Sequence, residues 1–129
     1  MTWVSLLADS GGLDRIYGGR PPALTSVRLH AVEVGREGPS LNLRFDLDVY
    51  PEQPPAKWAA QGYNTVQVTL SLGGLRDVTM NGFGTDPVVD ISVEGTDGVT
   101  LDIHSDEVQL HAVADAAYVS RISAYASAG

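Results

Sequence analysis

LNLRFDLDVY, residues 41–50, alternates apolar and polar side chains without interruption. The apolar positions are Leu41, Leu43, Phe45, Leu47 and Val49, and the alternate positions are Asn42, Arg44, Asp46, Asp48 and Tyr50. Successive side chains of a β-strand point to opposite faces of its sheet, so this stretch predicts a strand with one buried and one exposed face. Antiparallel sheets commonly keep one such solvated face, and we therefore expect antiparallel pairing.

The segments on both sides of this strand continue the period of two. Residues 27–31 alternate as well, but Val32 and Val34 are out of phase with them, which predicts a β-bulge near Ala31. Residues 66–72 alternate again and end at Gly73-Gly74. We expect a strand in each of these segments and a shorter one over residues 77–81.

The C-terminal part of the chain has the same pattern. Residues 89–94 and 99–104 alternate on either side of Asp97-Gly98, a dipeptide that is typical of the tight turn in a β-hairpin. A turn through Ser105-Asp106 leads to residues 108–114, and residues 117–125 form the last expected strand. The sequence thus predicts seven to eight strands.

Helical spacing is confined to short pieces. Trp3, Leu6 and Leu7 are spaced as on one face of a helix, and Leu13, Ile16 and Tyr17 repeat that spacing. In the proline-rich loop, helical potential is limited to about residues 56–61. We expect a mainly β (α+β) fold: a curved antiparallel sheet or sandwich of seven to eight strands, with one or two short N-terminal helices, in a single domain over residues 1–129.

Charge is distributed unevenly along the 129 residues. Up to residue 76, seven acidic residues balance seven basic ones, whereas the remaining 53 residues hold nine acidic residues and a single base, Arg121. The formal net charge of -8 therefore belongs to the last part of the chain. Binding to a phosphate backbone uses clusters of Lys and Arg, so this composition argues against nucleic acid as the direct ligand.

Several chemical classes are excluded or disfavoured. The chain has no cysteine, which excludes disulfides and thiolate metal sites. No Gly-x-Ser-x-Gly turn is present, and no serine and histidine form a recognisable nucleophilic arrangement, so the sequence does not indicate nucleophilic catalysis. The first apolar run is too short for a signal peptide or a membrane span, and we expect a soluble cytoplasmic protein.

Two sets of polar residues are candidates for a chemical site. Asp102, His104 and Asp106 are spaced by two, with His111 on the neighbouring strand, as oxygen and imidazole ligands of a divalent ion would be. Any solvated strand face gives the same spacing, and Ser105-Asp106 is expected to be a turn, so we predict no metal and no cofactor. As a general acid and base pair, Asp46 and Asp48 would need separate environments and a pocket, and an open strand face indicates neither. Together with Arg44 they are expected to form an exposed, ion-paired face.

The acidic strands have two interpretations. In one, Asp90, Glu94, Asp102 and Asp106 are only the solvated side of a sheet. In the other, adjacent strands stack these carboxylates into a patch that meets a basic partner protein and speeds docking by electrostatic steering. Their spacing alone does not choose between the two.

Particular blocks of sequence resemble a known family. They are residues 2–7 (TWVSLL), 13–19 (LDRIYGG), 21–24 (PPAL), 43–47 (LRFDL), 55–58 (PAKW) and 64–68 (NTVQV). On these blocks the chain resembles family 50 of the bacterial immunity proteins, the antidotes encoded beside polymorphic toxins, and looks like an actinobacterial member. The resemblance implies a mostly β domain that binds and neutralises a cognate toxin in the cytoplasm and has no catalysis of its own.

The toxin is expected to have a basic surface, as a nuclease with a positive substrate cleft would. The candidate contact residues are Asp90, Glu94, Asp102, His104 and Asp106. One alternative is a small-ligand-binding or enzymatic β domain in which Trp58, Tyr63 and Tyr50 line a pocket. Another is a self-associating module that pairs through its sheet edges.

Overall fold

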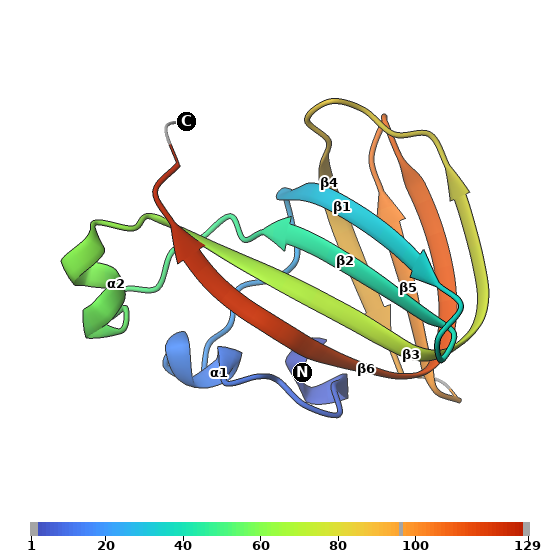
Figure 1. Cartoon of the computed structure of the whole chain (residues 1–129), viewed down its shortest axis with the longest axis horizontal. Helices are drawn as coiled ribbons and strands as arrows, with labels where there is room; N and C mark the ends of the chain where they lie inside the picture. The colour runs from blue at the N-terminus through green and yellow to red at the C-terminus, as the bar shows by residue number, and fades with distance from the viewer. Residues whose placement is uncertain (1–2, 96, 128–129) are drawn as a thin grey trace.

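The structure is a computed structural model, and it describes residues 3–95 and 97–127. Within this part of the chain, six antiparallel strands close into a barrel in the order β1-β2-β3-β6-β5-β4 (Figure 1). The strands are β1 (Val27–Gly35), β2 (Ser40–Asp46), β3 (Thr65–Asn81), β4 (Val88–Glu94), β5 (Val99–His104) and β6 (Gln109–Tyr125). The helical pieces are η1 (Trp3–Leu6), α1 (Leu13–Ile16) and α2 (Ala56–Gln61). The expected mainly β fold with short N-terminal helices is confirmed.

The expected number of strands was slightly too high because two long strands are continuous. Residues 66–72 and 77–81 belong to one strand, β3, and residues 108–114 and 117–125 belong to β6. These two strands pair with each other from end to end, with register shifts between Thr69 and Leu70 and between Leu75 and Asp77. Such a bulge bends a strand without ending it, and Gly74, with φ of 65°, lies beside the second shift.

The alternating side chains of residues 41–50 divide between core and surface as the sequence predicts, except at the C-terminal end of this stretch. Leu41, Leu43 and Phe45 are fully buried in the core. The strand ends at Asp46, however, and Val49 is 51% exposed instead of facing inward. The reason is that the Leu47 N–H still donates to Val66 O (2.9 Å), after which the chain leaves the sheet for the proline-rich loop.

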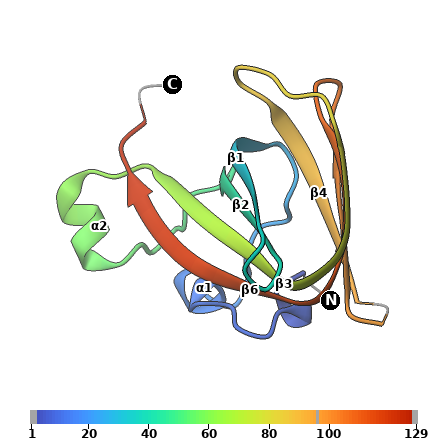
Figure 2. The same ribbon diagram turned by 45° about the vertical axis from the view of Figure 1, so that its right-hand side comes forward.

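The bulge, the hairpin and the short helix that the sequence predicts are all present in the structure. The β1–β2 register shifts between Leu29 and Ala31, which confirms the predicted bulge. β4 and β5 pair antiparallel on either side of Asp97-Gly98, which confirms the hairpin. Helix α2 covers the residues expected for it and lies beside the start of β3 and the end of β6 (Figure 2). Its Trp58 packs against the core.

The N-terminal segment covers part of the barrel. Leu13 of α1 is fully buried in the core, and η1 contacts β4. Between these two elements, the Ala8 N–H donates to Ala117 O and the Val119 N–H donates to Asp9 O, each at 2.8 Å. This segment therefore pairs with the edge of β6.

Because β3 and β6 bend, each contributes to both halves of the barrel (Figure 1). One half contains β1, β2, the first part of β3 and the last part of β6. The other contains β4, β5, the last part of β3 and the first part of β6. The polar side chains on the outer surfaces of these two halves form different kinds of site.

Candidate functional site

The acidic residues of the C-terminal part lie on the outer surface of one half of the barrel. Their neighbours along β4, β5 and β6 are buried in the core, so the alternation points the acids outward. The strand register places the outward residues in three rows: Asp90, His104, Gln109 and Asn81; Ser92, Asp102, His111 and Thr79; Glu94, Thr100, Val113 and Asp77. We call the outward surface formed by these three rows the acidic face.

Four of the five candidate contact residues share this face. Asp90 and His104 are directly opposite each other on β4 and β5, and Glu94 and Asp102 lie in the other two rows. Asp106 does not share the face, because it lies in the turn between β5 and β6. Asp77, which the candidate set omits, lies in the same row as Glu94 because β3 continues past its bulge.

The acids on and around this face differ in how they are compensated. The guanidinium of Arg76 lies 2.7 Å from Asp115 and 3.7 Å from Asp97, at the edge of the face. Asp90 Oδ1 accepts a hydrogen bond from the Ser26 N–H (2.9 Å). Within residues 3–95 and 97–127, Asp77, Asp90 and Glu94 have no ion pair.

His111 and Asp102 form the closest side-chain contact on the face. His111 Nδ1 lies 2.6 Å from Asp102 Oδ1, and both side chains are partly exposed. This hydrogen bond, together with the charge of Asp102, raises the pKa of His111 above its ordinary value of 6.5. In the described residues, no three histidine, aspartate or glutamate side chains are grouped so that they could hold a metal ion.

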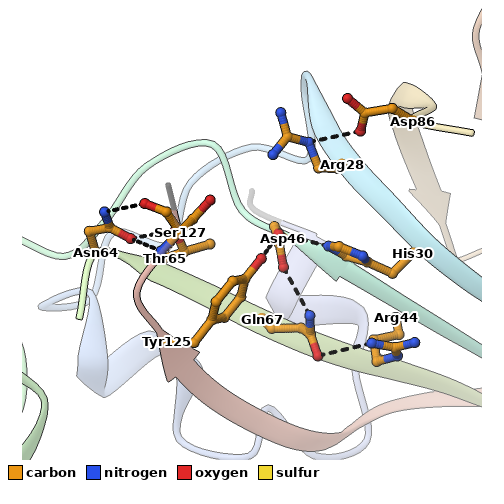
Figure 3. Close-up of polar contacts among 10 residues, drawn as sticks. All are labelled: Arg28, His30, Arg44, Asp46, Asn64, Thr65, Gln67, Asp86, Tyr125 and Ser127. Carbon is orange, nitrogen blue, oxygen red and sulfur yellow. Dashed lines mark hydrogen bonds and ion pairs between the residues drawn. The ribbon is translucent and has the colours of Figure 1, made fainter. Parts of the chain in front are cut away.

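A second polar cluster lies on the outer surface of the other half, around Asp46 (Figure 3). Asp46 is 5% exposed, and its carboxylate contacts three side chains from three other strands: His30 Nε2 at 2.8 Å, Gln67 Nε2 at 3.1 Å, and the hydroxyl of Tyr125, which donates to it. Burial, and secondarily the hydrogen bond to Asp46, raises the pKa of Tyr125 to about 12.

The expectation that Arg44, Asp46 and Asp48 form one exposed, ion-paired face is wrong for Asp46. Arg44 is turned to Gln67, at 3.5 Å, and no ion pair joins it to either aspartate among the described residues (Figure 3). Asp46 is buried because Tyr125 covers it, and Tyr125 lies 79 residues away along the chain. No pattern in the sequence around Asp46 signals that contact.

The aromatic residues of the alternative site are only partly brought together. Tyr50 and Trp58 lie with ring centroids 6.4 Å apart. Tyr50 lines two open depressions, one next to Asp46 and one next to Arg15 and Tyr17, and neither of these two contains Trp58 or Tyr63. Neither of these two depressions is therefore the expected pocket lined by Trp58, Tyr63 and Tyr50.

Together these features define a small antiparallel β-barrel protein whose exterior has an acidic half and a half with a buried, hydrogen-bonded aspartate. The model of the family described as Immunity protein 50 matches residues 10–125, and the chain belongs to this family. No curated protein and no solved structure matches the chain significantly.

The family resemblance that the sequence suggests is thereby confirmed. Membership makes the chain an immunity protein, and it implies a toxin as the binding partner. The helices in the described part of the chain are all too short to cross a membrane.

Proposed function

We propose that this chain binds a cognate polymorphic toxin in the cytoplasm and neutralises it by occupying its surface, without catalysis of its own. The acidic face is the docking surface, and Asp90, Glu94, Asp102 and His104 lie within the contact. Asp106 in the adjacent turn lies at its border. The toxin presents a basic surface there, as a nuclease does around its substrate cleft.

The observation that carries this proposal is the convergence of Asp77, Asp90 and Glu94 on one face without a compensating base. From residue 77 to residue 120 the chain contains no lysine or arginine. A surface of one sign attracts a partner of the opposite sign over about one Debye length, about 8 Å at physiological salt. Such steering raises association rates roughly 10- to 1,000-fold.

A first experiment tests neutralisation. The toxin-like protein encoded beside the gene of this chain is expressed alone and together with the chain in the same host. We expect growth arrest in the first case, growth in the second, and a stoichiometric complex in a pull-down. If the chain neither binds that protein nor restores growth, the proposal is wrong.

A second experiment tests the face. Asp77→Asn, Asp90→Asn and Glu94→Gln are combined in one variant, which removes three charges and keeps the side-chain shapes. Association with the toxin should slow about tenfold at low salt and lose much of its salt dependence, whereas dissociation should change less. Unchanged association kinetics would exclude the acidic face.

The matched control combines Glu33→Gln, Glu37→Gln and Glu52→Gln. These three residues are also exposed, and they lie outside the acidic face. The control variant has the same net charge as the test variant, so an effect of total charge would slow both equally. We expect the control to associate with nearly the wild-type rate.

A further inference from the structure

The last part of β3 is an open sheet edge. β2 pairs with β3 only as far as Ser40 and Gly73, and the Leu75 N–H then donates to Pro39 O (2.9 Å). Beyond that point, the described residues provide no backbone partner for β3 except β6. In Figure 1 this part of β3, in yellow, is the outermost strand of its half of the barrel.

The hydrogen-bond phase of β6 shows which backbone groups of β3 are open. The Ser105 N–H donates to Val108 O (3.1 Å), and pairs in an antiparallel ladder alternate between bonded and non-bonded. Three pairs further along, Asp102 and His111 are therefore a non-bonded pair. The backbone groups of His111 point the other way, to Thr79 of β3.

Because the backbone N–H and C=O groups of Thr79 bond to β6, those of the residues before and after it point away from β6. Val78 and Met80 thus direct their N–H and C=O groups to the open edge. An added strand would find alternate, correctly spaced donors and acceptors there, which is how an extended peptide joins an exposed sheet edge.

The side chains along this edge specify the chemistry of a strand that joins it. Val78 and Met80 face the core side, and Met80 is 41% exposed, so an apolar side chain beside it would remove apolar surface from water. On the outer side, exposed Asp77 ends the row that contains Glu94. An added strand with basic side chains on its outer side and apolar side chains on its inner side would match both the charge of Asp77 and the apolar surface of Met80.

We propose that an extended segment of the toxin, alternating basic and apolar residues, adds to β3 along residues 76–81. This inference rests on the proposed function and specifies how the acidic face is engaged. A second copy of this chain fits the edge less well, because edge-to-edge pairing would join two acidic faces, each in a chain of net charge -8. The toxin segment brings the opposite charge.

The test is amide hydrogen exchange, measured residue by residue on the unmodified chain. In the free protein, Val78 and Met80 should exchange quickly, whereas Thr79 should be protected by its bonds to β6. With the toxin encoded beside the gene of this chain bound, the amides of Val78 and Met80 should become protected. A complex in which both amides still exchange at their free rates would overturn the edge proposal while leaving the proposed function intact.

A pair of variants at one position separates the backbone from the side chain. Met80→Pro removes the open N–H, which β6 does not use, and Met80→Ala removes only the side chain. Met80→Pro should bind the toxin about tenfold more weakly than Met80→Ala does. Equal affinities of the two variants would contradict strand addition.

Two further outcomes are decisive. If Val78 and Met80 become protected at high protein concentration without toxin, the edge belongs to a second copy and the toxin assignment is wrong. If the wild-type chain forms no complex with the toxin at all, both the proposed function and the edge proposal fall.

Discussion

His111 and Asp102 are opposite each other on β6 and β5, and their side chains meet with 2.6 Å between Nδ1 and Oδ1. The pair lies in the middle row of the acidic face, where a protonated imidazole offsets one carboxylate. The charge of the face therefore depends on pH, because the pKa of His111 is raised by this contact.

We predict that Asp102→Asn lowers the pKa of His111 toward its ordinary value of 6.5, as followed by NMR titration of the imidazole protons. Asp77→Asn should lower the pKa by less, since Asp77 acts only through its charge and is the smallest of the contributions that raise it. An equal effect of the two substitutions would contradict the hydrogen bond.

The same pair makes stability depend on pH. Because the folded-state pKa of His111 is raised, the stabilisation is complete below pH 6.5 and is lost as the pH rises through the raised pKa. Unfolding by urea at a series of pH values should show this loss in the wild type. The loss should be much smaller in Asp102→Asn, in which only the weaker effect of Asp77 still raises the pKa of His111.

Asp46→Ala should destabilise the barrel by about 3 kcal/mol, because His30, Gln67 and Tyr125 each lose an acceptor in a buried setting. Asp48→Ala is the matched control, since Asp48 is exposed two residues away, and it should change stability by less than about 0.5 kcal/mol. Chemical denaturation measures both. Similar losses would mean that the Asp46 contacts contribute little.

Asp90 combines a charge with a backbone contact, and two substitutions separate them. Asp90→Asn keeps an oxygen for the Ser26 N–H and should preserve stability while slowing toxin association. Asp90→Ala also removes the acceptor and should cost about 1 kcal/mol of stability. Equal stability of the two variants would show that the Ser26 contact is dispensable.

Gly98 and Gly12 both have positive φ, at 97° and 87°, but they differ in their surroundings. A Cβ on Gly98 would lie 2.5 Å from Ala114 O, whereas a Cβ on Gly12 meets nothing within 4 Å. Gly12→Ala should cost about 1–2 kcal/mol from backbone strain alone, and Gly98→Ala should cost clearly more because the β4–β5 turn must move. Thermal unfolding of the two variants gives the comparison.

Much of the fold could be predicted because it follows from local patterns. The alternation at Leu41, Leu43 and Phe45 fixes which side of β2 is buried, and the phase change at Val32 locates a bulge. Asp97-Gly98 specifies its own hairpin. The acidic face follows from the same alternation, since the outward positions of successive strands hold the acids.

What the sequence did not reveal depends on contacts between distant segments. Gly73-Gly74 has the composition of a turn, yet pairing with β6 on both sides of it keeps β3 continuous. That continuity brings Asp77 onto the acidic face and creates the open edge. Asp46 has the spacing of an exposed residue, and only the position of Tyr125 buries it.

The separation between the buried side chains and the outward side chains has a consequence for how such a protein can diversify. Along each strand of this half of the barrel, buried core residues alternate with residues of the acidic face. The two sets therefore occupy separate positions in the sequence. Outward residues such as Thr79, Ser92 and Thr100 alternate with the buried ones, so we expect their replacement to leave the packing of the interior unchanged. The same barrel is therefore able to present different outer surfaces, each suited to a different toxin.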